Sequence, residues 1–139
     1  MLVPGNTTCP AKRDTFEKEF IDNGFLLFRV QWVEGNNYFL FNTLSGEKTY
    51  IGGRAFFSPN GEYLISIEDD IESSYSFNGF QLYSVENDGH LRLIWQFSPV
   101  WGPCNIKWID NSSLVTKGYY LNDNREEISF FKNIKISMR

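Results

Sequence analysis

The chain has 139 residues, enough for one domain with its own hydrophobic core. Its formal net charge of −4 argues against a nucleic-acid partner, because affinity for phosphate backbones comes mainly from Lys and Arg. Aromatic residues make up 17% of the chain and alanine is found only at Ala11 and Ala55, which favours strands over helices. No stretch approaches the roughly 18 apolar residues of a membrane-spanning helix, so we expect no membrane span.

The N-terminal residues lack the periodicity of a helix or a strand. Residues 1–14 contain two prolines, and we interpret them as an irregular arm before a single all-β domain over residues 15–139. They also lack the apolar core of a signal peptide. Two localisations stay open, the cytoplasm or, for a mature exported form, the periplasm or the exterior.

The two cysteines, Cys9 and Cys104, lie far apart in the sequence. In a cytosolic protein we expect both to be free thiols. In an oxidising compartment a Cys9–Cys104 bridge would instead tether the N-terminal arm to the domain.

Short runs of alternating apolar and polar residues, separated by turn residues, follow one another through the rest of the chain. The clearest stretch runs from Ala55 to Phe97, where turns at Asn60-Gly61 and Asp88-Gly89 separate strands of an antiparallel meander. We predict about ten strands and no helix longer than two turns. The expected strands cover residues 15–21 (which also suit a single helical turn), 25–33, 38–42, 48–51, 54–58, 62–68, 79–85, 91–97, 105–109, 113–119 and 126–136. A rigid loop is expected over residues 98–104.

The segment from Phe57 to Ser66, FSPNGEYLIS, carries a characteristic turn. It resembles the WD-like repeats of TolB-type β-propellers, whose blades have a Phe-Ser-Pro-Asp-Gly-Lys turn between the first two strands. Here Asn60 replaces the aspartate and Glu62 the lysine, and a second unit opening at Ile106 lacks the Pro and the Gly. The resemblance implies four-stranded, blade-like units that repeat roughly every 45 to 50 residues. It transfers no functional residue, because the motif is a structural turn.

The number of such units limits the architecture. The chain supplies about three units, whereas a closed propeller needs at least about four blades. We therefore expect blade-like units packed as a sandwich, an open barrel or a partial propeller, and an oligomer could complete a ring.

The sequence contains few residues suited to catalysis or metal binding. His90, the only histidine, falls in a predicted turn, which argues against a catalytic triad. Two cysteines and one histidine without close spacing cannot form a four-ligand zinc site. A phosphate-binding loop is absent as well. We predict a protein without catalytic residues, bound metal or cofactor.

Two groups of residues suit contact with a partner protein. One is an acidic cluster that would attract a basic partner, and the other is a pair of loop aromatic residues that would serve as anchors. The predicted contact residues are Glu68, Asp69, Asp70, Glu72, Tyr75 and Trp101. The strand residues Trp32, Trp95 and Trp108 are instead expected in the core.

These residues favour a non-catalytic protein-binding domain, such as a small acidic inhibitor or immunity protein that blocks a toxin or enzyme. One alternative is a carbohydrate- or cell-surface-binding module that uses Trp101, Tyr75 and Tyr119. A second alternative is a hydrolase that uses the acidic loop.

Overall fold

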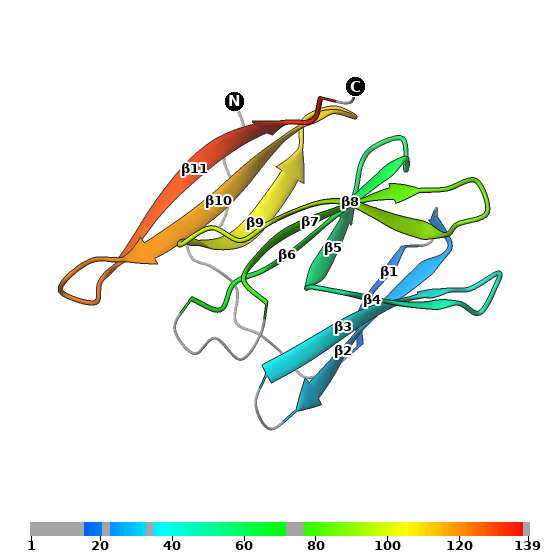
Figure 1. The fold of residues 1–139 in the computed structure, drawn as a ribbon, viewed down its shortest axis with the longest axis horizontal. Coiled ribbons are helices and arrows are strands. Elements are labelled where there is room, and N and C mark those ends of the chain that lie inside the picture. Colours follow the sequence, from blue (N-terminus) through cyan, green and yellow to red (C-terminus); the bar gives the residue numbers. More distant parts are fainter. Residues whose placement is uncertain (1–15, 21–22, 33–34, 72–76, 138–139) are drawn as a thin grey trace.

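The structure, a computed structural model, describes residues 16–20, 23–32, 35–71 and 77–137 (Figure 1). These ranges contain eleven strands and no α-helix, which confirms the all-β prediction. The predicted arm, residues 1–14, lies outside the described residues. The strands are β1 (Phe16–Phe20), β2 (Phe25–Trp32), β3 (Gly35–Asn42), β4 (Lys48–Ile51), β5 (Arg54–Phe57), β6 (Tyr63–Glu68), β7 (Gly79–Val85), β8 (Leu91–Phe97), β9 (Gly102–Trp108), β10 (Ser113–Leu121) and β11 (Glu127–Lys135).

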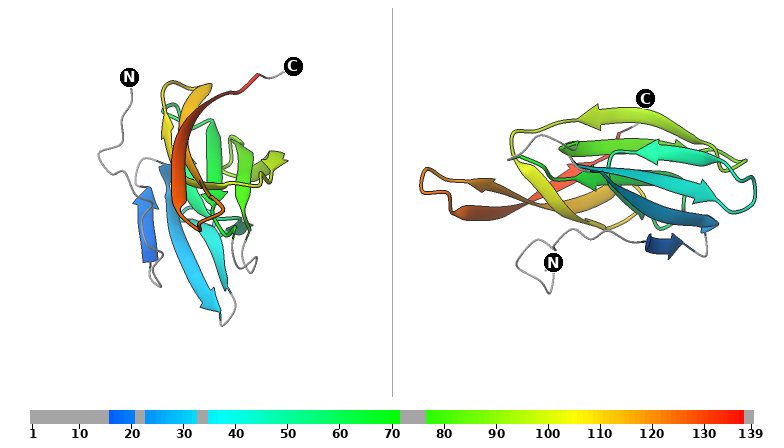
Figure 2. Two further views of the ribbon diagram at one scale, coloured as in Figure 1. Left: turned by 90° about the vertical axis from the view of Figure 1, so that its left-hand side faces the viewer. Right: turned by 90° about the horizontal axis from the view of Figure 1, so that it is seen from below.

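The strands form three separate antiparallel sheets, each a meander of consecutive strands. We call them sheet A (β1–β4), sheet B (β5–β8) and sheet C (β9–β11). Sheet B lies between the other two (Figures 1 and 2). Sheet A starts at Phe16, sheet B at Arg54 and sheet C at Gly102. Sheet C has three strands instead of four, and no barrel closes among the described strands.

Both faces of sheet B are buried. On one face Leu64 of β6 joins the hydrophobic core shared with sheet A, and on the other Ile65 and Ile67 join the core shared with sheet C. As a result every residue of β6 after Tyr63 is buried. Alternate residues of β6 therefore face two different hydrophobic cores. In a sheet with one solvent-exposed face, alternate residues would instead face the core and the solvent.

The predicted Ser58-Pro59-Asn60-Gly61 turn is present and links two sheets. Gly61 has φ 74°, a conformation that glycine adopts without strain. The Ser58 hydroxyl donates to Asn60 Oδ1 (2.9 Å) and accepts the Tyr63 N–H (3.0 Å). The backbone N–H of Asn60 donates to Asn111 Oδ1 (2.8 Å), in the turn between β9 and β10. The corresponding turns of successive units are thus hydrogen-bonded to each other.

The structure corrects one prediction near Cys104 and decides between two alternatives for the cysteine itself. The loop predicted over residues 98–104 ends early, because β9 begins at Gly102 and includes Pro103. Proline is tolerated there because β9 is an edge strand, paired only with β10. Cys104 is fully buried and disulfide-bonded, which is the state expected for an oxidising compartment and not the free thiol expected in the cytosol. The chain's other cysteine, Cys9, lies outside the described residues.

Candidate functional site

Glu68, the first member of the predicted acidic cluster, is fully buried at the end of β6. Its carboxylate accepts the Asp69 N–H (3.0 Å) and a hydrogen bond from the Tyr38 hydroxyl of β3. Burial raises the pKa of Tyr38, and the Glu68 carboxylate raises it further. A side chain at this depth presents no charge to a partner. We therefore remove Glu68 from the predicted contact residues.

Of the next two acidic residues, Asp69 joins sheets B and C, and Asp70 joins the end of β6 to the segment before β7. Asp69 Oδ2 accepts a hydrogen bond from the Tyr119 hydroxyl of β10 (2.9 Å), and Asp69 Oδ1 lies 3.9 Å from Arg54 Nη2. The Asp70 N–H donates to Asn78 Oδ1 (2.9 Å). These contacts hold the end of β6 against sheet C, so the Asp69 carboxylate already has partners within the protein.

Trp101 packs back onto the body of the protein. Its ring meets the buried ring of Phe80 edge-on at 5.6 Å between centroids, and that of Phe130 at 5.0 Å. The side chain is half-buried and covers the junction of sheets B and C. The other two predicted contact residues, Glu72 and Tyr75, lie outside the described residues.

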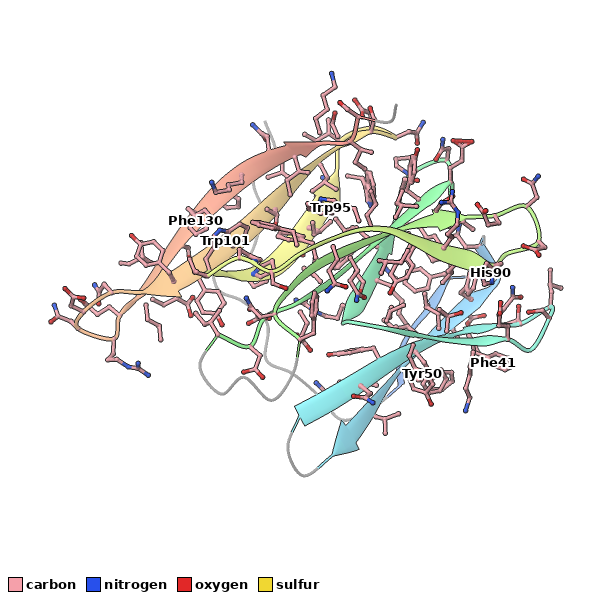
Figure 3. All side chains as sticks on the ribbon, viewed as in Figure 1. Phe41, Tyr50, His90, Trp95, Trp101 and Phe130 are labelled. Atoms are coloured by element: carbon pink, nitrogen blue, oxygen red, sulfur yellow. The ribbon has the colours of Figure 1, made fainter. Side chains whose placement is uncertain are left out.

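Trp101 belongs to a row of aromatic rings that runs from the edge of sheet B to the outer hairpin of sheet C (Figure 3). Successive ring centroids are 6.0, 6.4, 5.6, 5.0 and 6.3 Å apart. In order, the residues of this aromatic row are Trp95, Phe97, Phe80, Trp101, Phe130 and Tyr120. In its centre Phe80 is buried and Trp101 and Phe130 are half-buried, whereas Trp95, Phe97 and Tyr120 at its ends are 41%, 47% and 45% exposed.

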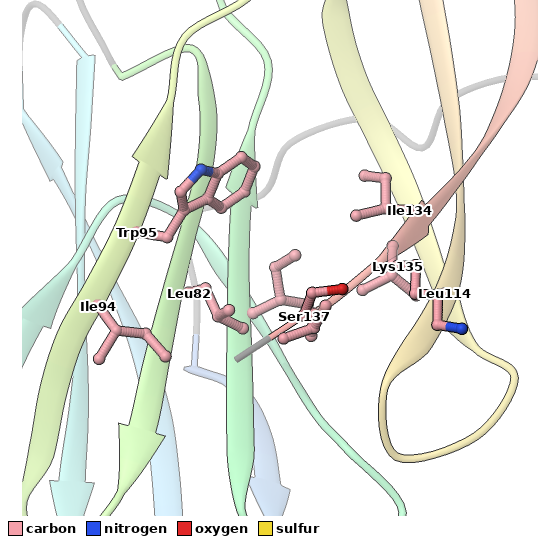
Figure 4. A pocket seen from close by; sticks show the side chains of 9 residues that line it. Leu82, Ile94, Trp95, Leu114, Ile134, Lys135 and Ser137 are labelled. Atoms are coloured by element: carbon pink, nitrogen blue, oxygen red, sulfur yellow. The ribbon is translucent and has the colours of Figure 1, made fainter. Parts of the chain in front are cut away.

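An apolar groove of about 370 Å³ adjoins the exposed β8 end of the row (Figure 4). Trp95 forms part of its wall, so the groove and the aromatic row share a residue. Most of the lining is aliphatic, and the charged residue in it is a lysine. The lining includes Leu82, Ile94 and Trp95 of sheet B and Leu114, Ile134 and Lys135 of sheet C. We take the aromatic row and this groove together as the candidate binding site.

The sequence placed Trp95 in the core, and this was wrong. β8 is the outer edge of sheet B, so it has a neighbouring strand on one side only among the described strands. A bulge at Ile94 also shifts the register, so that Trp95 pairs with Leu82 while Leu93 pairs with Tyr83. The available signal was the run LRLIWQF itself, which carries more apolar residues than a half-buried edge strand needs.

Trp108 and Trp32 are the other two tryptophans that were predicted to lie in the core. Trp108 is half-buried, packs on the core between sheets B and C, and donates its indole N–H to the Phe56 carbonyl (3.0 Å). The side chain of Trp32 lies outside the described part of the structure.

We also looked for metal-binding groups, a membrane-spanning helix, an active-site histidine and related proteins. Among the described residues, no group of three or more His, Cys, Asp or Glu side chains could hold a metal ion. The same part of the chain has no helix that is long and apolar enough to span a membrane. His90 is exposed in its turn, with Nδ1 at 3.4 Å from Glu47 Oε2. Comparisons with protein-family models, curated proteins and solved structures found no significant match.

Proposed function

We propose that the chain is a non-catalytic protein-binding domain whose contact surface is the aromatic row and the groove beside it. The observation that carries this proposal is the stacked pair of Trp95 and Phe97, exposed on an edge strand. Large exposed aromatic side chains are frequent anchors of protein interfaces, because each buries a large area at small entropic cost. Contiguous exposed apolar surface is likewise a mark of interaction sites.

The walls of the groove favour a protein partner over a sugar. They are mainly aliphatic, and an apolar peptide side chain would bury well against them. The carbohydrate alternative draws support from the Trp95–Phe97 pair, whose rings lie 27° apart and could stack on a sugar ring. Trp101, the platform that the sequence suggested for a sugar, instead contacts Phe80 and Phe130.

The inhibitor or immunity role is a narrower form of this proposal. It was inferred from the all-β class and the acidic net charge, with residues 68–72 as predicted contacts, and Glu68 and Asp69 have partners within the protein. An inhibitor would therefore act through the aromatic row. The same internal contacts weaken the hydrolase alternative, which needs accessible carboxylates.

We also propose that sheets A, B and C are propeller-like blades. The meander order within each sheet and the hydrogen bond between the Asn60 and Asn111 turns support this comparison. A ring completed from several copies would give one defined oligomer by light-scattering chromatography. A monomer at all concentrations would contradict ring completion by copies.

Site-specific cross-linking tests the binding proposal. A photo-crosslinking amino acid placed at Phe97 should capture a partner from native lysate, and the same amino acid at Tyr50 of β4 should not. Tyr50 is a matched control because it is an aromatic residue on the edge strand of sheet A and is 60% exposed. Retention of the captured protein should be lost in Trp95→Ser and kept in Tyr50→Ser.

The results of these experiments distinguish the protein-binding proposal from the carbohydrate alternative. Retention that survives Trp95→Ser would contradict the proposed surface. A glycan-array signal that disappears in Trp95→Ser, without any captured protein, would favour the carbohydrate alternative.

A further inference from the structure

We propose that β8 is a docking edge for an extended segment of the partner protein. This inference rests on the proposed function and specifies its mode. The segment adds to sheet B as a fifth strand, directs alternate apolar side chains toward the Trp95 wall of the groove, and carries an acidic residue near Lys132. Main-chain hydrogen bonds then supply affinity, and the groove supplies selectivity.

The first argument is the character of the edge. β8 is seven residues long and pairs only with β7 among the described strands, which leaves its outer N–H and C=O groups available. It also exposes Leu93, Trp95 and Phe97. Edges are usually protected by charge or proline. The single charged residue of β8, Arg92, has its Nε 3.3 Å from a Glu86 carboxylate oxygen.

The other outer edges are less suited to a new strand. β9 packs against β6 and β7 of sheet B. β11 carries Glu127, Lys132 and Lys135 along its length, and such charges disfavour pairing with a further strand. The remaining edge strands are short: β4 and β5 have four residues each and β1 has five.

The second argument is the position of the groove. A strand beside β8 would lie about 4.8 Å further out in sheet B, and every second side chain would face sheet C. These side chains would pack against the outer side of Trp95, which forms the β8 wall of the groove (Figure 4). Its volume of about 370 Å³ holds more than one aliphatic side chain. The groove thus favours Val, Ile, Leu or Phe at alternate positions.

The third argument is charge. Lys132 Nζ lies 6.0 Å from the centroid of the Phe130 ring, and Lys132 alternates with Ile134 on one face of β11, whereas the amino group of Lys135 points away from the groove (Figure 4). Within the described ranges neither ammonium group forms an ion pair, and no carboxylate lines the groove. A partner segment with an acidic residue beside Lys132 would form a charge pair close to the apolar surface of the groove. The local charge is therefore opposite to the net charge of the chain.

A panel of blocked nine-residue peptides tests the proposal. Val, Ile or Phe alternates with Thr, and one position holds either Glu or Lys. Binding is followed through the amide NMR shifts of the labelled protein. We expect shifts concentrated in residues 91–97 and tighter binding of the Glu peptides. Trp95→Ser should weaken binding about tenfold or more, whereas Tyr50→Ser should leave it unchanged. Lys132→Glu should reverse the preference between the Glu and Lys peptides.

Backbone N-methylation isolates the strand-addition step. In a bound strand alternate N–H groups point to the same side, so methylating one alternate set should abolish binding while methylating the other set should not. Equal binding of both methylated forms, with Trp95→Ser still weakening it, would overturn strand addition and leave the proposed binding surface intact. No shift in residues 91–97 at millimolar peptide would overturn the inference. A protein dimer that Trp95→Ser dissociates would overturn it in favour of a second copy on β8.

Discussion

Replacing Gly118 with alanine tests the packing at the centre of the aromatic row. A Cβ on Gly118 would lie 2.6 Å from Trp101 Cε3 and 2.8 Å from Phe130 Cζ. Both distances are roughly 1 Å shorter than ordinary carbon contacts of about 3.5–4.0 Å. Overpacking of this kind costs about 1–3 kcal/mol, and alanine in a strand regains about 0.5–1 kcal/mol relative to glycine. We expect the free energy of unfolding to fall by about 1–2 kcal/mol, and Tm by about 3–6 °C.

Urea unfolding followed by circular dichroism measures the effect of Gly118→Ala in two backgrounds, the native chain and Trp101→Leu. Removing the indole ring removes the closest contacts of the new methyl group. In the Trp101→Leu background the substitution should therefore cost less than in the native chain, because only the 2.8 Å approach to Phe130 Cζ remains. An equal loss in both backgrounds would show that Trp101 does not pack on Gly118, and the aromatic row would have to be abandoned.

Three further predictions concern the core and the disulfide. Burial raises the pKa of Tyr83 from 10.0 to about 12, so the stability that the neutral phenol contributes is complete below pH 10 and is lost as the pH rises through 12. Tyr83→Phe should therefore flatten the fall in the free energy of unfolding between pH 10 and 12. An unchanged pH profile would contradict the raised pKa of Tyr83. A Cβ on Gly53 would collide with the backbone carbonyl of Ile67, so Gly53→Ala should lower the free energy of unfolding by about 3 kcal/mol or more, seen as a lower Tm. Cys104→Ser should lower it by about 2–5 kcal/mol. Alkylation of the unfolded native chain should change its mass only after reduction, and alkylation without reduction would rule out the bridge.

Local sequence signals were sufficient to predict the strands. β7 and β8 were predicted with their observed bounds, because alternating runs there end at clear turn residues. The turn glycines Gly24, Gly61 and Gly89 all have positive φ, the conformation for which glycine is favoured. Each of these features depends on a few neighbouring residues, and so it can be recognised without knowledge of the tertiary structure.

The candidate site could not be predicted in this way, because it depends on which sheet covers which face. Glu68 lies on the more polar face of β6, and that face points toward sheet A. Its burial is a consequence of the position of sheet B between two others. Trp95 was wrongly predicted to lie in the core because the position of its strand at the edge of sheet B was not known. It is an apolar residue in a regular strand, and only the sheet order shows that β8 is an outer edge.

The positions of the charged residues also change the partner charge that we expect from the acidic composition. Several carboxylates have partners within the protein: Asp69 accepts from Tyr119, Glu86 from Ser84, and Asp110 from the Ser112 N–H. These acids fix turns and sheet contacts and keep their charge, and the net charge of −4 is a sum over the whole chain that does not give the charge at the groove. Near the groove the positive charge comes from β11, chiefly from Lys132, which lies on the same face as Ile134. Because charge steering depends on the field at the contact surface, Lys132 favours an acidic partner segment over the basic partner that the composition suggested.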